Sequence, residues 1–168
     1  MNRQIVLIAV DVRSAHNVGS LLRTADAMAI KEVWLVGISP YPKLENDSRL
    51  PHVATRATNE IHKTALGAEK TLTLKHFETS ELETAVSQLK KNNYLVVALE
   101  QTTSAKNLKQ FKAPAKLALM VGNEVEGLNE KLLNMADETV MIPMLGAKES
   151  LNVAVAAGMA LYKIRFGE

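Results

Sequence analysis

The sequence predicts one α/β domain with a mainly parallel sheet flanked by helices, and three observations support this. The 168 residues, 47% of them hydrophobic, are enough for one domain with a core and too few for two ordinary domains. Short apolar runs of strand length recur along the chain, and stretches with helical periodicity lie between most of them. This alternation is typical of parallel sheets whose strands are joined by helices. We therefore expect a single domain over residues 1–168.

The predicted strands are short runs rich in apolar and β-branched residues. They are Ile5–Val10, Val33–Val36, Tyr94–Leu99, Leu117–Val121 and Thr139–Ile142. The first run stops at Asp11, which makes it too short for a membrane span and unlike a signal peptide. We expect it to be a buried strand.

Two helices are predicted in the first half of the chain. Asn17 is a good N-cap for the first of them. The residues after it give a stripe that faces the core: Leu21, Leu22, Ala25 and Met28. The run after Gly37 contains three prolines among polar residues, so we expect an exposed excursion. It should end near a helical stretch from Asn59 to Ala68.

The final segment, Glu149 to Phe166, is apolar nearly all round. One stripe consists of Leu151, Val155, Met159, Tyr162 and Phe166, and a second of Val153, Ala156, Ala157, Ala160 and Ile164. A helix of this kind must be buried on more than one side. We expect one side to face the chain's own core and the other a partner subunit; the alternative is a central helix of a monomer.

Composition excludes several classes of site. The absence of cysteine rules out disulfides, thiolate metal sites and a cysteine nucleophile, and we expect a cytoplasmic protein without a metal. The net charge of +2, from 20 basic and 18 acidic residues, neither requires nor excludes a nucleic-acid partner.

Three segments could carry chemistry, and the first is Asn17-Val18-Gly19-Ser20-Leu21-Leu22-Arg23-Thr24-Ala25. Asn17, Ser20 and Arg23 recur every three residues, so they should line one polar face of the helix. An arginine near the carboxyl end of a strand could engage a phosphate or a developing oxyanion. The alternative is an ordinary capped helix with a solvated arginine.

The second segment is Gly122-Asn123-Glu124-Val125-Glu126-Gly127-Leu128, directly after a predicted strand. Glycine there allows a sharp turn and the close approach of a ligand. The chain contains no Gly-x-Gly-x-x-Gly and no P-loop, which argues against a dehydrogenase-like dinucleotide site. A purely structural turn remains the alternative.

The third segment, Ile142-Pro143-Met144-Leu145-Gly146-Ala147-Lys148-Glu149-Ser150-Leu151-Asn152-Val153, joins the last predicted strand to the terminal helix. Its proline and glycine predict an irregular loop. Ser150 and Asn152 are expected at the helix start, where both residue types also serve as ordinary caps.

Together the segments closely resemble the SpoU, or TrmH-type, RNA 2′-O-methyltransferases of the SPOUT superfamily. The resemblance runs from about Ile5 to Tyr162 and covers three motifs in order. They are Asn17-x-Gly19-x-x-x-Arg23-Thr24, then Gly122-Asn123-Glu124-x-x-Gly127, then Ile142-Pro143-Met144 with Ser150-Leu151-Asn152.

The resemblance implies a C-terminal trefoil knot, an exception to the rule that chains do not thread loops. It also implies a homodimer and S-adenosylmethionine as cofactor. The residues expected to bind this cofactor are Leu99, Gly122, Asn123, Glu124, Ile142, Pro143, Met144, Ser150 and Leu151.

The implied reaction is methylation of a ribose 2′-hydroxyl in tRNA or ribosomal RNA, with Arg23 nearest the hydroxyl. Because arginine stays protonated, we expect Arg23 to orient the target phosphate and stabilise the developing alkoxide. The residues expected to position it are Asn17, Glu124, Ser150 and Asn152. The main alternative is a catalytically silent member of the fold that binds RNA or a nucleotide.

Many relatives carry an extra N-terminal RNA-binding domain, and we expect none here. The catalytic domain would then have to grip the RNA itself. The candidate residues lie in the exposed excursion and the helix after it, although they could equally serve solubility: Lys43, Arg49, His52, Arg56 and Lys63.

Overall fold

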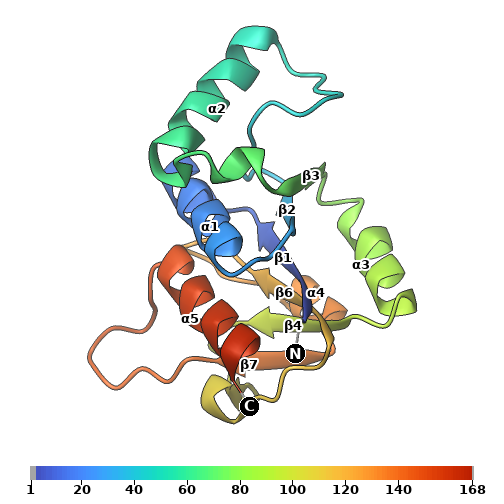
Figure 1. Ribbon diagram of the computed structural model, residues 1–168. Coiled ribbons are helices and arrows are strands. Elements are labelled where there is room, and N and C mark those ends of the chain that lie inside the picture. Colours follow the sequence, from blue (N-terminus) through green and yellow to red (C-terminus); the bar gives the residue numbers. More distant parts are fainter. Residues whose placement is uncertain (1–2, 168) are drawn as a thin grey trace.

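The computed structural model describes residues 3–167, which form a seven-stranded sheet with helices on both faces (Figure 1). The strands are β1 (Gln4–Val10), β2 (Glu32–Val36), β3 (Thr73–Phe77), β4 (Leu95–Leu99), β5 (Lys106–Asn107), β6 (Lys116–Val121) and β7 (Glu138–Met141). Their order is β3-β2-β1-β6-β4-β7-β5, and each pair of neighbours is parallel. The predicted α/β fold is confirmed.

The five predicted strands are confirmed to within one residue at each end. β1, β4 and β6 lie in the interior of the sheet and are covered on both faces, which explains their nearly continuous apolar sequences. Two strands were not predicted: β3 at one edge of the sheet and the two-residue β5 at the other.

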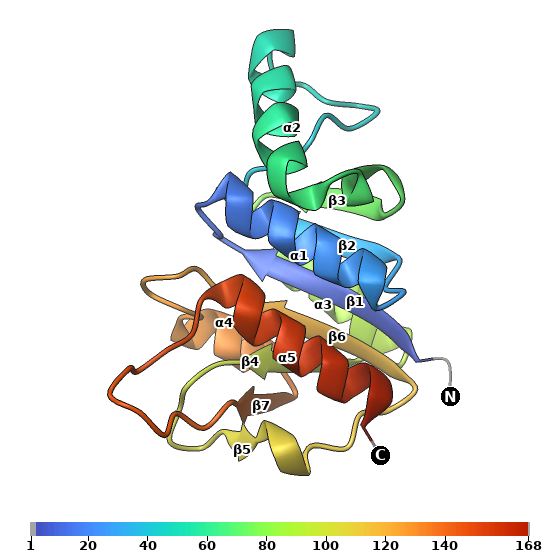
Figure 2. The ribbon, with the colours of Figure 1, turned by 60° about the vertical axis from the view of Figure 1, so that its left-hand side comes forward.

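The helices are α1 (Ala15–Ala27), α2 (Pro51–Ala65), α3 (Leu82–Lys91), α4 (Glu130–Met135) and α5 (Val153–Phe166). Figure 2 shows α1 and α5 side by side on one face of the sheet, with α2 packed against α1. Leu82 of α3 and Leu132 of α4 pack into the apolar cluster on the opposite face. Successive residues of a strand point to opposite faces, so Leu7 and Ile8 of β1 belong to different clusters.

The N-terminus of α1 differs from the prediction. Ser14, not Asn17, is the N-cap, because its side chain accepts a hydrogen bond from the backbone N–H of Asn17 at 3.3 Å. Serine is as good an N-cap as asparagine, and Ser14 comes three residues before Asn17, so the helix begins earlier than predicted. The Asn17 side chain, in the first turn of α1, is therefore available for contacts with other segments.

The predicted helix from Asn59 to Ala68 was wrong at both ends, since α2 begins at Pro51 and ends at Ala65. Proline is tolerated in the first turn of a helix, because a backbone N–H there would have no acceptor within the helix. The chain leaves the helix at Leu66, which is left-handed with φ of 53°.

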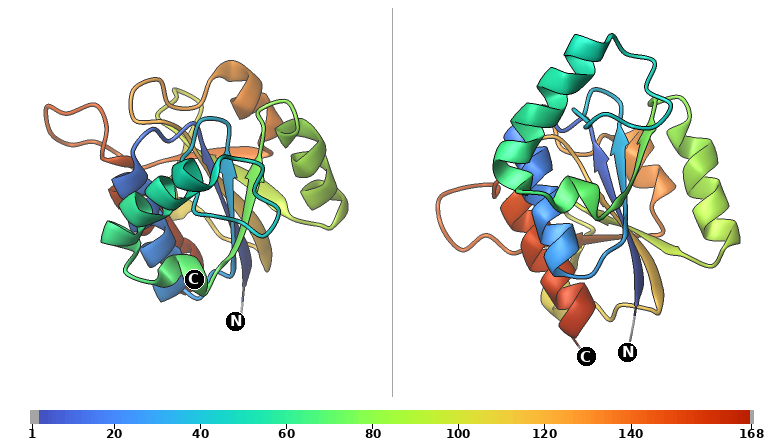
Figure 3. Two further views of the ribbon diagram at one scale, coloured as in Figure 1. Left: turned by 90° about the horizontal axis from the view of Figure 1, so that it is seen from above. Right: turned by 45° about the horizontal axis from the view of Figure 1, so that its top comes forward.

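The terminal helix also begins later than predicted, at Val153 rather than Glu149, with Asn152 as its N-cap. The residues between β7 and α5 form a loop that projects from the body of the molecule (Figure 3). Of the two apolar stripes on this helix, Val153, Ala157, Ala160 and Ile164 are buried as expected, and Ala156 is partly buried. The other stripe is exposed, so α5 lies at the surface of this chain and not at its centre.

Candidate functional site

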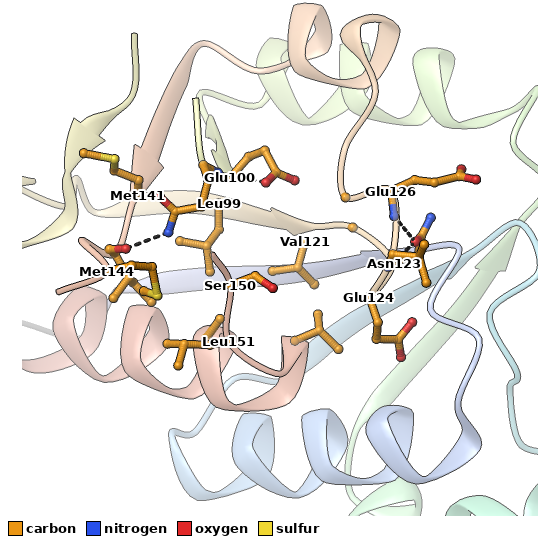
Figure 4. A pocket seen from close by; sticks show the side chains of 17 residues that line it. Leu99, Glu100, Val121, Asn123, Glu124, Glu126, Met141, Met144, Ser150 and Leu151 are labelled. Carbon is orange, nitrogen blue, oxygen red and sulfur yellow. Dashed lines mark hydrogen bonds between the residues drawn. The ribbon is translucent and has the colours of Figure 1, made fainter. Parts of the chain in front are cut away.

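A pocket opens at the edge of the sheet where β4, β6 and β7 end and α5 begins. Figure 4 shows side chains from all of these segments around the cavity, including Leu99, Val121, Ser150 and Leu151. The empty space, including the solvent at its open mouth, is about 770 Å³. Open α/β sheets bind their ligands at this edge.

Two positions in the loop after β6 require glycine. A Cβ on Gly122 would lie 2.4 Å from the carbonyl carbon and oxygen of Gly127. Gly127 has a φ of +65°, and a Cβ there would lie 2.2 Å from a carboxylate oxygen of Glu100. Since side chains rarely adopt this φ and the space is already filled, the turn depends on both glycines.

Asn123 holds the tip of the same loop. Its side-chain oxygen accepts hydrogen bonds from the backbone N–H groups of Val125 at 2.8 Å and Glu126 at 2.7 Å. The backbone N–H of Gly127 also donates to the carbonyl oxygen of Asn123 at 3.2 Å. The loop is thus a fixed wall of the pocket.

The three sequence motifs meet at Asn17. Its side-chain nitrogen donates to Glu124 at 2.5 Å, and its side-chain oxygen accepts from the side-chain nitrogen of Asn152 at 3.0 Å. Asn152 also caps α5 by accepting from the backbone N–H groups of Ala154 and Val155. One chain of hydrogen bonds therefore joins the first motif to the second and the third.

Glu124 is an ionised anchor for the start of α1. Burial alone would raise its pKa, but this is outweighed by hydrogen bonds, chiefly from the Asn17 side chain and also from the backbone at Arg13 and Ser14. The net pKa of Glu124 is lowered, so its carboxylate is charged at neutral pH and acts as an acceptor. The N–H of Arg13 lies 3.3 Å from it.

Arg23 is exposed on α1, nearly two turns beyond Asn17. It does not line the pocket, and it makes no hydrogen bond or ion pair with any of residues 3–167. The structure therefore brings Asn17, Glu124 and Asn152 together but leaves the arginine of the first motif facing solvent.

Most residues predicted to bind a cofactor line the pocket: Leu99, Gly122, Asn123, Glu124, Ile142, Met144, Ser150 and Leu151. Pro143 does not. Sequence reasoning missed Glu100, Gln101, Val121, Val125, Glu126, Gly127, Met141, Val153 and Ala156. The sequence did contain a signal for Glu100 and Gln101, because polar residues directly after a buried strand are candidates for a ligand site at the edge of the sheet.

The residues expected to grip RNA differ in availability. Arg49 is not available, because its guanidinium donates to Asp47 at 2.9 Å and to the carbonyl oxygens of Tyr41 and Pro42. The hydrogen bonds from Arg49 hold the pKa of Asp47 well below its usual range. Lys63 pairs with Glu60 at 2.7 Å, while the remaining candidates, Lys43, His52 and Arg56, are exposed.

Over residues 3–167, no cluster of three or more histidine or acidic side chains is arranged to hold a metal ion. In the same part of the chain, no helix has both the length and the apolar character needed to cross a membrane.

Comparison with known proteins gives relatives over almost the whole chain. It is 33% identical over 164 residues to the 23S rRNA (guanosine-2′-O-)-methyltransferase RlmB of Acinetobacter baylyi, covering 96% of this chain and 60% of that protein. It is 29% identical over 152 residues to the tRNA (guanosine(18)-2′-O)-methyltransferase of Escherichia coli, covering 90% and 58%. The chain thus spans somewhat less than two thirds of the length of these relatives.

The fold has solved counterparts. The SpoU methyltransferase AviRb of Streptomyces viridochromogenes, crystallised in complex with the cofactor AdoMet, superimposes with a TM-score of 0.79 at 22% identity. The match covers 98% of this chain and 57% of that one. A family model, the SpoU rRNA Methylase family, matches residues 4–162, which include all three motifs. The chain therefore belongs to the SpoU rRNA methylase family.

Proposed function

We propose that this chain is an S-adenosylmethionine-dependent RNA 2′-O-ribose methyltransferase acting on tRNA or ribosomal RNA. The observation that carries the proposal is the hydrogen-bonded chain Asn152–Asn17–Glu124 beside the pocket, which joins motifs more than 100 residues apart in the sequence. The names of the relatives support it, since one is a 23S rRNA and one a tRNA guanosine-2′-O-methyltransferase.

The chemistry of the pocket lining supports S-adenosylmethionine as the ligand. Gly122 belongs to the tight turn that forms one wall of the pocket, and Leu99, Ile142 and Leu151 offer apolar walls for an adenine ring. The carboxylates of Glu124 and Glu126 at the lining suit a cationic ligand. We propose that the predicted binding residues hold the cofactor, with Pro143 acting only through the shape of its loop. The bound cofactor would supply an electrophilic methyl group on a sulfonium.

The chain's own residues would orient the acceptor. A ribose hydroxyl loses its proton as it becomes a nucleophile, and the charge that develops on its oxygen needs stabilisation. We assign that role to the guanidinium of Arg23, which is free to meet RNA laid across α1, with the proton leaving to water or the substrate phosphate. Asn17, Glu124, Asn152 and Ser150 would position the reacting groups.

Two properties of the assembly belong to the same proposal. The exposed apolar stripe on α5 would be covered by a second copy of the chain, which makes the enzyme a homodimer. The exposed residues Lys43, His52 and Arg56 would contact RNA. Residues 1–168 would act as one methyltransferase domain, in the cytoplasm with its RNA substrate.

We also propose that the C-terminal part is threaded as a trefoil knot. The chain leaves β4, reaches β5 on the far side of β7, and returns to β6, so β7 lies within the span of that connection. The segment after β7 then continues to α5 on the face that α1 also covers. The side chain of Gln101 ties the two passing segments by donating to the carbonyl oxygen of Ile142 at 2.6 Å.

The test measures cofactor binding and product together. Calorimetry should show binding of S-adenosylmethionine and none of nicotinamide dinucleotides. Transfer of labelled methyl to tRNA or ribosomal RNA should give 2′-O-methylnucleosides by mass spectrometry, and RNA with a single 2′-deoxy at the target should bind but accept no methyl. Cofactor binding without transfer to any RNA would favour the silent alternative, and methylation of the deoxy RNA would show that a base is modified.

A further inference from the structure

We infer that Glu100 and Gln101, the two residues that follow β4, are positioning residues that fix the spacing of the cofactor pocket. We call this pair the β4 clasp. It joins the loop of residues 122–128 to the loop of residues 142–151, and these loops supply most of the pocket lining. The inference rests on the proposed function, because it assigns the clasp to the binding of S-adenosylmethionine.

Glu100 holds the first loop. One carboxylate oxygen accepts the backbone N–H of Leu128 at 2.8 Å, and the other accepts the N–H of Gln101 at 2.8 Å. The carboxylate lies where a side chain on Gly127 would have to be, since a Cβ there would be 2.2 Å away. Both oxygens thus face N–H donors, an arrangement that a carboxylate satisfies and an amide cannot.

Gln101 holds the second loop. Its side-chain nitrogen donates to the carbonyl oxygen of Ile142 at 2.6 Å. Ile142 is the first residue after β7, and beyond Met144 the loop is exposed up to α5, with Leu145 98% exposed. A loop with so few buried contacts depends on its anchors at either end, which are Gln101 and the Asn17–Asn152 pair.

The clasp links these loops independently of the hydrogen-bonded chain Glu124–Asn17–Asn152. Within residues 3–167, no hydrogen bond runs directly between residues 122–128 and residues 142–151. Of the two consecutive residues that follow β4, Glu100 binds the first loop and Gln101 binds the second. The width of the pocket is therefore set from its third wall, where Leu99, Glu100 and Gln101 also line the cavity.

Two isosteric variants test the clasp. Glu100→Gln turns an amide N–H toward a backbone N–H, and Gln101→Glu turns a carboxylate toward the carbonyl of Ile142. Each should raise the Kd for S-adenosylmethionine about tenfold, the scale of one mispaired, partly buried hydrogen bond. The KM for the cofactor should rise with it, while kcat at saturating cofactor and the KM for RNA should stay within about twofold of the wild type.

The matched controls are Glu83→Gln and Gln110→Glu, which make the same changes at exposed residues on α3 and in the 3-10 turn at Leu108–Gln110. Both should behave like the wild type. Hydrogen exchange without ligand gives a second readout: both clasp variants should exchange faster in residues 122–128 or 142–151, while the strands keep their protection. Because Gln101 is exposed, Gln101→Glu should fold even if Glu100→Gln does not.

The outcomes separate the clasp from the proposed function. Cofactor affinity equal to the wild type in folded clasp variants would overturn the inference and leave the proposed function intact. A higher Kd accompanied by a proportional loss of kcat, or by global loss of protection, would also overturn it, because the residues would then act on the chemistry or on the whole fold. A wild-type protein that bound no S-adenosylmethionine would overturn the proposed function, and with it the cofactor role of the clasp.

Discussion

Arg23 can be separated experimentally from the cofactor pocket, because its exposed side chain lies outside the pocket lining. We predict that Arg23→Ala keeps the fold and the Kd for S-adenosylmethionine but loses methyl transfer by about 10²-fold or more, the scale of one preorganised stabilising donor. Arg23→Lys should restore little, since an ammonium lacks the guanidinium's bidentate fork. Single-turnover transfer to RNA measures this. Near-normal turnover in Arg23→Ala would leave the arginine a solvated helix residue.

Gly122 is confined by backbone rather than by movable side chains. A Cβ there would meet Gly127 at 2.4 Å and the nitrogen of Leu128 at 2.7 Å. We therefore predict that Gly122→Val abolishes measurable cofactor binding by calorimetry and lowers stability by about 1–3 kcal/mol through overpacking. Gly146→Val is the control, because a Cβ on Gly146 has no neighbour within 4 Å. Unchanged cofactor affinity in a folded Gly122→Val protein would show that the assigned pocket is wrong.

At the residue scale, the sequence could predict the parts of the site that depend on local chemistry. Gly122 and Leu151 lie in motifs whose resemblance to a family predicted their place in the pocket. The role of Glu100 depends on the N–H of Leu128, 28 residues away, which no local pattern reveals. Asn17 was misjudged for a related reason, because its hydrogen bonds to Glu124 and Asn152 are contacts between distant segments.

Among the elements, α1 and α2 cross unusually closely at Gly19. A Cβ on Gly19 would lie 2.4 Å from the carbonyl oxygen of Ile61, 2.1 Å from Oγ1 of Thr64 and 2.9 Å from the nitrogen of Ala65. Alanine would add about 1 kcal/mol of helix propensity. Because two of the three obstacles are backbone atoms, the helices would have to separate, at a cost of about 1–3 kcal/mol or more.

We therefore predict that Gly19→Ala lowers the free energy of unfolding, by about 1 kcal/mol or more, despite its favourable propensity. Urea denaturation measures the change. Gly158→Ala on α5 is the matched control, since a Cβ there would meet Cγ2 of Thr24 at an ordinary 3.7 Å. That variant should gain up to about 1 kcal/mol. A Gly19→Ala protein as stable as the control would mean that the crossing has room for a side chain.

The elements that the sequence did not predict are those with weak apolar patterns. β3 is an edge strand in which Thr73 and Lys75 are exposed and the other residues only half buried, so it lacks the apolar run of the interior strands. β5 has two polar residues and exists only through its pairing with β7. α2 buries just Ala54, Ile61 and Ala65, too few to mark its first turns.

For the whole molecule, strand content was predictable but strand order was not. β7 pairs with β4, about 40 residues earlier, and with β5, and these parallel pairings are set by tertiary packing rather than by local sequence. The resulting arrangement places the ends of β4, β6 and β7 side by side and creates the pocket. The site is thus a property of topology, which the sequence supplied only through resemblance to a family.

The surface of α5 predicts how the molecule assembles. Four large apolar side chains form one exposed stripe on it, with exposed fractions from 47% to 61%: Val155, Met159, Tyr162 and Phe166. Leu151, in the loop just before the helix, is 39% exposed. Contiguous apolar surface of this kind on a compact domain marks an interaction site.

A second copy of the chain would cover this stripe, so light scattering should give a dimer at low micromolar concentration. Val155→Glu would bury an unpaired charge in that contact and should weaken the dimer on the order of 100-fold or dissociate it, while the monomer keeps its fold because Val155 faces solvent there. Val53→Glu on α2 makes the same change at a valine of similar exposure, 42% against 52%, and should stay dimeric. A stable and active wild-type monomer at that concentration would contradict the prediction, and equal dimer affinity in both variants would place the interface elsewhere on the surface.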